Sequence, residues 1–283
     1  MNGSQPRIEP SQGASLLSAA ERLPLLETAA DAVRAAEAVL ETAAGGEIRV
    51  LSWMSHDLKL ELDRLCESAM IERIREEYPA DSILTEESGL LRGTSERTWV
   101  IDPLDGTVNF SHGLPFYAIS IACASCRPEQ LYRCWQTHAE AAVVSLPPHG
   151  ETFRATRNGG ATRNGNPLHL ADRADLSKAL VCLGVSVKDG ALPFTLRVIE
   201  AFAGQAQKVR SLGALAGELA FLAAGRIDAL VQKGTNIWDF LASGLLISEA
   251  GGRFEAAEFA PGRWKVVAGN PGLFDRVEAM VHE

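Results

Sequence analysis

The chain has 283 residues, of which 46% are hydrophobic and 22% charged, and its formal net charge is −9. These values are typical of one large or two ordinary globular domains. The acidic balance disfavours a nucleic-acid-binding surface, which needs a basic stripe. The net negative charge is still compatible with a small anionic substrate, provided that divalent cations help to bind it.

Targeting and membrane segments are not expected. Residues 1–20 lack the apolar centre of a signal peptide, and no later run is long and uncharged enough to cross a bilayer. We expect residues 1–20 to form a flexible tail. The five cysteines, an odd number in a chain of this size, are expected to be reduced thiols of a cytoplasmic protein.

Hydrophobic periodicity predicts the elements in chain order. Apolar residues at helical spacing predict helices over 21–44 and 63–77. Apolar or alternating runs then predict strands over residues 82–85, 98–102, 117–125, 141–145 and 151–156. From residue 176 the two types alternate, with strands over 180–183, 208–212 and 227–232 and helices over 193–205, 213–225 and 239–250.

The change of pattern places a seam near residues 165–175. We therefore expect an N-terminal α+β part over residues 21–170 and a C-terminal α/β part over residues 171–283. The acidic residues described below would lie at the junction of the two parts, where ligand sites are common.

Two short patterns are interpreted as structural. Asn-Gly pairs at 158–159 and 164–165 predict two neighbouring turns, and phosphate binding by Arg157 and Arg163 is the alternative. The set Cys123, Cys126, Cys134 and His138 looks like zinc ligands at first. Because residues 123 and 126 would point to opposite faces of a strand, buried thiols are favoured.

The most informative segment runs from Trp99 to Phe110 and reads WVIDPLDGTVNF. Asp102 ends an apolar run, and Asp105 follows on a Pro/Gly turn, so both can point to one side. Asp239 begins another apolar segment far downstream. Crowded carboxylates raise one another's pKa, and folds that gather them usually neutralise them with a metal ion. Oxygen ligands without nearby His or Cys favour Mg²⁺ over Zn²⁺.

Backbone groups of the same turn complete this picture. The Leu104 carbonyl would face the same space, Gly106 allows close backbone approach, and the amides of Gly106 and Thr107 can receive a phosphate oxygen. This is the donor set of a two-metal phosphoryl-transfer site. The alternative is structural, because D-P-x-D-G is also a turn signal and Asp63 and Asp239 stand where helix N-caps are expected.

The ordered motifs resemble those of the inositol monophosphatase family. They are Glu86-Glu-Ser88, the Trp99–Phe110 segment, Trp238-Asp239, and Ser248-Glu-Ala-Gly-Gly252. The resemblance covers the chain from about residue 21 to the end. It implies a layered αβαβα sandwich and Mg²⁺-dependent hydrolysis of a phosphate monoester of a small polyol or sugar. It also implies a homodimer and sensitivity to lithium.

The resemblance also implies a metal-ligand set of five residues. Glu86, Asp102 and the Leu104 carbonyl would hold one Mg²⁺. Asp102, Asp105 and Asp239 would hold a second ion, with Asp102 bridging the two. The first ion would lower the pKa of the attacking water, and the second would neutralise the phosphate and the leaving alkoxide.

The same resemblance implies catalytic and substrate-binding residues. Thr107, positioned with Asp63 and Glu86, would orient the attacking water. The amides of Gly106 and Thr107 would bind the phosphate. The remaining contacts, on the side of the alcohol, would come from Gly213, Ala214, Leu215, Gln232 and Asp239.

Some positions depart from the family pattern. Gln232 stands where members that hydrolyse inositol phosphates have a glutamate, and its neutral amide leaves the polyol preference open. Leu60 and Ser52 replace a usual threonine and a frequent lysine, with Lys59 next to them. These changes keep the metal ligands but leave a third, weaker Mg²⁺ site open.

Two other functions remain alternatives. The same site fits a 3′(2′),5′-bisphosphate nucleotidase or a histidinol phosphatase, although Val108-Asn109 lacks the lysine common in those branches. A binding or regulatory protein that keeps the fold is the third possibility, and the complete carboxylate set argues against it. A small phosphorylated substrate, no nucleic acid and no membrane are the partners we expect.

Overall fold

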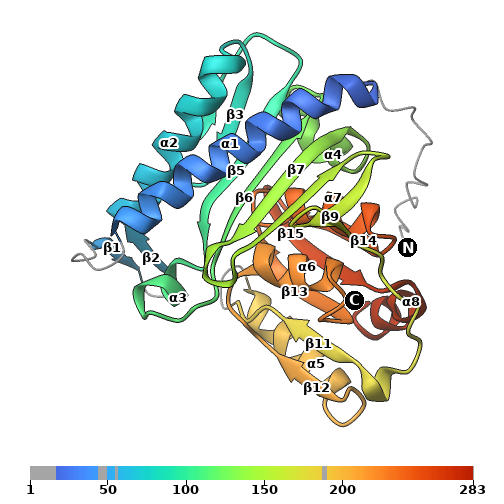
Figure 1. Ribbon diagram of the computed structural model, residues 1–283. Helices are drawn as coiled ribbons and strands as arrows, with labels where there is room; N and C mark the ends of the chain where they lie inside the picture. Colours follow the sequence, from blue (N-terminus) through green and yellow to red (C-terminus); the bar gives the residue numbers. More distant parts are fainter. Residues whose placement is uncertain (1–16, 44–49, 55–56, 187–189, 283) are drawn as a thin grey trace, which may run out of the picture.

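An eight-stranded mixed sheet lies at the centre of the molecule (Figure 1). The structure is a computed structural model that describes residues 17–43, 50–54, 57–186 and 190–282, with the backbone alone at residue 43 and over 50–54 and 57–60. The strand order is β10-β9-β8-β7-β6-β5-β3-β4. In chain order the strands are β3 (Ser82–Thr85), β4 (Gly89–Leu91), β5 (Thr98–Asp105), β6 (Ala118–Ala124), β7 (Ala139–Leu146), β8 (Glu151–Thr156), β9 (Gly160–Arg163) and β10 (Asn166–Pro167).

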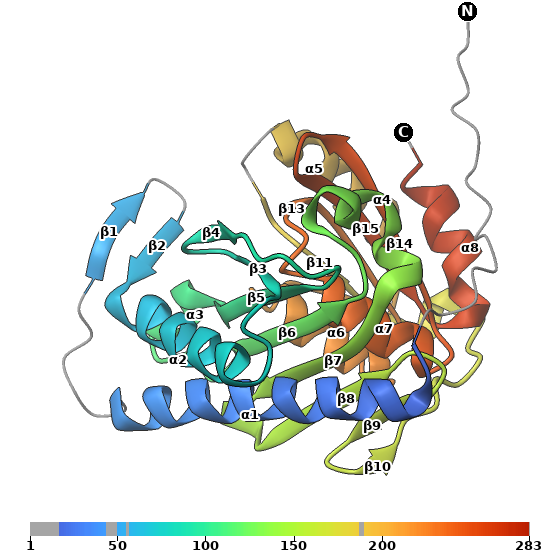
Figure 2. The same cartoon turned by 90° about the horizontal axis from the view of Figure 1, so that it is seen from above.

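Helices cover both faces of this sheet, which explains why β6 and β7 are buried throughout and read as continuous apolar runs. On one face, α1 (Ala19–Ala43) and α2 (Glu61–Glu77) pack on Trp99 and Ile101 of β5. On the other face, α6 (Leu215–Ala223) and α7 (Leu241–Glu249) share a core with Val100. In Figure 2, α1 runs along the outside of the sheet.

A second sheet of five strands completes the layers. Its order is β12-β11-β13-β15-β14, with β11 (Leu180–Leu183), β12 (Lys208–Arg210), β13 (Ala229–Thr235), β14 (Arg253–Ala260) and β15 (Arg263–Gly269). One face packs on α6 and α7, and the other forms a third core with α5 (Ala191–Phe202) and α8 (Pro271–Met280). Helix, sheet, helix, sheet and helix layers follow one another, which confirms the predicted αβαβα sandwich.

The smaller elements lie between and beside the layers. Two short strands, β1 (Val50–Met54) and β2 (Asp57–Leu60), form an antiparallel ribbon at the end of the molecule away from α8 (Figure 2). The short α3 (Thr107–Ser111) follows β5, and α4 (Pro128–His138) precedes β7. Two single turns of 3₁₀ helix complete the description, η1 (Pro147–His149) and η2 (Leu176–Lys178).

Most predicted elements are confirmed within a few residues, and the differences have local causes. Helix α1 begins at Ala19, because Ser18 and Glu21 form reciprocal hydrogen bonds of the capping-box type at its start. The predicted tail over residues 1–20 is therefore two residues too long where the structure describes it, and residues 1–16 lie outside the described ranges. The division at residues 165–175 stays a prediction.

The two patterns interpreted as structural agree with the fold. Asn158 and Asn164 adopt positive φ values of 58° and 47° in consecutive hairpin turns. Arg157 donates to the carbonyls of Ala139 and Gln136, so it serves the turn rather than the cleft. The four-residue zinc pattern also divides as predicted, because Cys123 and Cys126 are buried in different cores on opposite sides of the sheet. No helix in the described ranges is long and apolar enough to span a membrane.

Candidate active site

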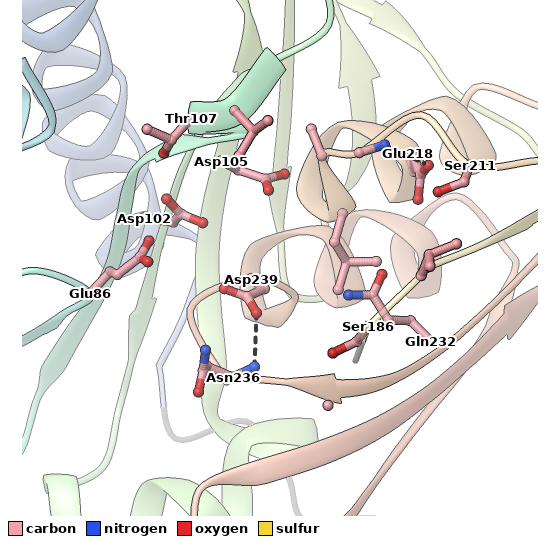
Figure 3. A pocket seen from close by; sticks show the side chains of 18 of the residues that line it. Glu86, Asp102, Asp105, Thr107, Ser186, Ser211, Glu218, Gln232, Asn236 and Asp239 are labelled. Atoms are coloured by element: carbon pink, nitrogen blue, oxygen red, sulfur yellow. Dashed lines mark hydrogen bonds between the residues drawn. The ribbon is translucent and has the colours of Figure 1, made fainter. Parts of the chain in front are cut away.

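A cleft of about 510 Å³ opens between the two sheets (Figure 3). Glu218 of α6 lines it, and four further carboxylates from three parts of the chain face it. Glu86 comes from the β3–β4 turn, Asp102 and Asp105 from β5, and Asp239 from the loop before α7. The predicted residues that line this cleft are Glu86, Asp102, Leu104, Asp105, Gly106, Thr107, Gly213, Ala214, Leu215, Gln232 and Asp239. Asp63 is buried on α2 and is not among the lining residues described.

A bulge in β5 explains why its two aspartates face the same side. Residues three apart in a regular strand point to opposite faces. Here Asp102 pairs with Ser120 and Asp105 with Ala118, so β5 has one residue more than its neighbour over this stretch. Such a bulge re-aims the side chains that follow it. Both carboxylates therefore reach the cleft.

The electrostatic state of Asp102 reflects this crowding. Its side chain is 2% exposed, and burial raises its pKa well above the usual range. The charges of Glu86, Asp105 and Asp239 raise the pKa further, while the Leu104 N–H, 3.2 Å from Oδ1, lowers it. Removal of the repulsion requires either protons or a cation.

Asp105 joins the cleft to a helix of the other half. Its Oδ2 accepts hydrogen bonds from the backbone N–H groups of Ala216, at 2.6 Å, and Gly217, at 3.4 Å, in the first turn of α6. Burial and the charge of Asp239 raise the pKa of Asp105, and these two N–H groups oppose that shift. The carboxylate therefore caps a helix of the second half while it faces the cleft.

The interpretation of Asp239 and Asp63 as helix N-caps is wrong. Helix α7 begins at Leu241, and Asp239 instead accepts hydrogen bonds from the Thr235 hydroxyl and from the Asn236 N–H at 2.8 Å. These bonds fold the loop back and hold the carboxylate toward the cleft (Figure 3). Helix α2 begins at Glu61, so Asp63 lies inside its first turn.

The turn after Asp105 requires the glycine that follows it. Gly106 has φ +92°, and a Cβ there would lie 2.9 Å from the Cβ of Ala214. The close approach brings the start of α3 against the segment before α6. At the start of α3, the Thr107 hydroxyl donates to the Leu104 carbonyl at 3.0 Å. A hydroxyl that donates in this direction keeps its oxygen available as an acceptor.

The segment before α6 is held by a glutamate that the sequence reasoning missed. Glu218 is 1% exposed and accepts hydrogen bonds from the N–H groups of Leu212 and Gly213. Burial raises the pKa of Glu218 to about 7, and these N–H groups oppose the shift. The Gly213 amide, expected to face the alcohol of a substrate, is therefore hydrogen-bonded within the chain. An acidic residue inside the apolar run Leu215–Ala223 was the available signal.

The end of the cleft away from Glu86 and Asp102 is lined by polar side chains (Figure 3). Gln232 lies here, and its side chain covers Gly184 so closely that a Cβ on Gly184 would be 2.1 Å from the amide oxygen. Arg263 of β15, also missed by sequence reasoning, lines the cleft too and donates at 2.8 Å to the side chain of Asn236, whose N–H holds Asp239. The cleft therefore has an acidic end and a polar end.

The donors at the acidic end fit Mg²⁺ by their chemistry. They are carboxylate oxygens and one backbone carbonyl, the ligands that hard divalent cations prefer. Burial, and after it repulsion from neighbouring carboxylates, raises the pKa values of Asp102 and Asp105, and a bound cation would relieve the repulsion. In the described part of the chain no three such side chains close around one point. The donors thus share a space without forming a closed coordination shell.

Comparison with known proteins gives the family. The model of the inositol monophosphatase family matches residues 21–280. The chain belongs to this family. Among relatives, the Nus factor SuhB of Pseudomonas aeruginosa is 37% identical over 227 residues, which are 77% of this chain and 80% of the relative.

Two solved structures extend the similarity of this inositol monophosphatase family member to three dimensions. The extragenic suppressor protein suhB from Bartonella henselae has a TM-score of 0.81 at 26% identity and covers 92% of this chain and 99% of its own. The inositol monophosphatase from Anabaena (Nostoc) has a TM-score of 0.78 at 30% identity, with 92% and 96% covered. The family fold is thus shared almost throughout.

Proposed function

We propose that this chain is a phosphoric monoester hydrolase that acts on a phosphate monoester of a small polyol or sugar, with two or three Mg²⁺ ions. The observation that carries the proposal is the meeting of Glu86, Asp102, Asp105 and Asp239 at one end of a cleft large enough for such a substrate. Membership of the inositol monophosphatase family supports the reaction class.

In this proposal Glu86, Asp102 and the Leu104 carbonyl hold one ion, and Asp102, Asp105 and Asp239 hold the second. When bound, Mg²⁺ neutralises the phosphate and the leaving alkoxide and makes water a stronger nucleophile. The amides of Gly106 and Thr107 at the start of α3 bind the phosphate oxygens.

The attacking water is oriented by Thr107 together with Glu86. Because the Thr107 hydroxyl donates its hydrogen bond to the Leu104 carbonyl, its oxygen can accept a hydrogen bond from that water. Asp63 is buried on α2 and is not among the residues that line the cleft, so in this proposal it positions Thr107 and does not contact the substrate. The alcohol group faces Gly213, Ala214 and Leu215, which lie beside Gly106, and Gln232 at the polar end.

Phosphate release from a substrate panel tests the proposal. The panel contains inositol 1-phosphate, hexose phosphates, a nucleoside 3′,5′-bisphosphate and histidinol phosphate, each with Mg²⁺ and with chelator. We expect Mg²⁺-dependent release that is fastest with a polyol or sugar monoester and is inhibited by lithium. Preference for the bisphosphate or histidinol phosphate would select the corresponding alternative. No release from any ester would refute a phosphatase function.

A regulatory function is the second candidate, favoured by the name Nus factor SuhB of the bacterial relatives. The discriminating variant is Asp105→Asn, which abolishes hydrolysis in the proposal. The variant gene replaces the wild-type gene in the cell. If catalysis is the function, this cell should no longer show the wild-type phenotype. An unchanged phenotype with no hydrolysis supports a regulatory role.

The remaining predictions from the sequence belong to the same proposal. They are a homodimer, a cytoplasmic location and the absence of a nucleic-acid partner. The homodimer is tested by light scattering, which measures the molar mass of the purified protein. The measurement is made at concentrations below and above the one used in the activity assay.

A further inference from the structure

Glu67 is a buried carboxylate outside the cleft that contacts the turn carrying Glu86. It lies on α2, is 3% exposed, and accepts four hydrogen bonds. Two donors are the hydroxyls of Thr85 and Ser88, and two are the N–H groups of Glu87, at 3.1 Å, and Ser88, at 3.4 Å. All four donors come from residues one or two positions from Glu86 in the chain.

The turn itself has few other restraints from the sheet. β3 and β4 form a hairpin in which Thr85 pairs with Gly89, so residues 86–88 are its three-residue loop. Gly89 closes this loop with φ +71°, as such loops require. β4 is an edge strand, so the hairpin has a neighbour only on the β3 side. Glu67 thus supplies hydrogen-bond acceptors where the strand ladder ends.

Burial of a carboxylate is unfavourable unless hydrogen bonds replace its hydration. Glu67 meets this condition with neutral donors from the last residue of β3, Thr85, and from two residues of the loop, Glu87 and Ser88. Oxygen Oε2 alone accepts from the hydroxyl before Glu86 and from both amides after it. Residue 86 is therefore fixed on both sides, and the direction of its side chain into the cleft follows.

We propose that Glu67 is a positioning residue that holds Glu86 in the orientation needed to bind a divalent cation. The inference rests on the proposed function, because it concerns the same cation site. Groups that orient metal ligands from outside typically contribute a factor of about 10 to 100 in metal affinity. Glu67 acts on the loop backbone and does not touch the substrate.

Mg²⁺ titration by calorimetry, without substrate, tests the inference. In Glu67→Met a side chain of similar length accepts none of the four bonds, and we expect the Mg²⁺ dissociation constant to rise about 10- to 100-fold. Glu67→Gln keeps one oxygen for the three donors of Oε2, and its amide can donate to the Ser88 hydroxyl. We therefore expect this conservative variant to bind Mg²⁺ nearly as the wild type does.

A matched control is available at Glu249, whose carboxylate accepts the N–H groups of Asn158 and Gly160 in a turn away from the cleft. Glu249→Met removes the same kind of contact, and we expect no change in Mg²⁺ affinity. Equal losses in the two Met variants would overturn the inference, as would a folded Glu67→Met protein with wild-type affinity.

Activity gives an independent measurement. If Glu67 acts through cation binding, the loss of turnover in Glu67→Met is recovered by raising the Mg²⁺ concentration, whereas a general packing defect is not. Should Glu67→Met fail to fold, Ser88→Ala and Thr85→Val replace it, and each is expected to weaken Mg²⁺ binding about 5-fold. Absence of phosphate release by the wild type would overturn the proposed function alone, because the Mg²⁺ titration needs no substrate.

Discussion

The acidic end and the polar end of the cleft are built differently. At the acidic end a bulge in β5, a left-handed glycine and tight turns aim Asp102, Asp105 and Thr107. At the polar end Gln232 projects from β13, and its side chain packs on Gly184 of another segment. Local backbone geometry thus aims Asp102, Asp105 and Thr107 into the cleft, whereas a contact with another segment places Gln232, the residue proposed for substrate choice. The two ends can therefore be perturbed separately.

The largest expected effect is at the acidic end. Asp102→Asn removes the shared ligand of the proposed ions, and we expect turnover to fall by at least about 100-fold. Because burial and three neighbouring carboxylates raise the pKa of Asp102, the same change should increase the thermal stability of the protein in chelator. Phosphate release and calorimetric unfolding measure the two effects. A variant that is less active and also less stable without metal would contradict the repulsion described here.

Gly106→Ala perturbs the backbone of the acidic end. The new Cβ meets Ala214 at 2.9 Å and needs φ +92°, so we expect a loss of about 1–3 kcal/mol in the free energy of unfolding, with reduced turnover. Gly113→Ala is the control, since Gly113 has φ +70° with open space around its Cβ position. Denaturant unfolding should show the smaller loss in the control. Equal losses would mean that backbone strain alone, without the close approach, accounts for Gly106.

Gly184→Ala addresses the polar end. The new Cβ displaces the Gln232 side chain, so we expect KM for the preferred monoester to rise about 10-fold while kcat changes little. The double variant Gly184→Ala/Gln232→Ala should show the KM of Gln232→Ala alone, because the clash is gone. Steady-state kinetics decides between these results. A fall in kcat at constant KM would place Gln232 with the reacting groups instead.

The last prediction concerns the pH dependence of stability and is made for Glu218. The pKa of Glu218 is about 7 in the folded protein, above its ordinary 4.5, so the folded state binds this proton more tightly. The stability linked to it is complete below about pH 4.5 and is lost as the pH rises through 7. Glu218→Gln does not titrate, so its stability relative to the wild type should increase between pH 5 and 8, by at most about 1.4 kcal/mol per pH unit. Denaturant midpoints over that range measure it, and parallel profiles would contradict the assignment.

Sequence reasoning succeeded where structure is local. The Trp99–Phe110 segment contains the strand, the turn and the glycine that build most of the acidic end, so its lining residues could be named in advance. Pro103 inside an apolar strand was also a signal for the bulge, because proline is tolerated in strands mainly at edges and bulges. The N-cap interpretation of Asp239 failed because its carboxylate accepts hydrogen bonds from Thr235 and Asn236 in the preceding segment. The sequence pattern does not reveal these contacts.

Other features depended on packing between distant segments. Glu67, Glu218 and Arg263 look like ordinary charged residues, and their partners become apparent only when the helices meet the loops. Among the elements, α4 and α8 were not predicted although each begins at a proline, a recognised helix-start signal. The edge strands β4 and β14 are only half-buried, so their hydrophobic patterns are weak.

The bond between Asp105 and α6 gives the protein an intrinsic reporter. The Ala216 and Gly217 amides are donors to a carboxylate that also faces the cleft. Any charge placed near Asp105 changes the electron density of that carboxylate and, through it, the chemical environment of both amide protons. Their NMR resonances should follow occupancy of the cleft directly, so that ligand binding can be read from the helix of the opposite half without a label or a coupled assay.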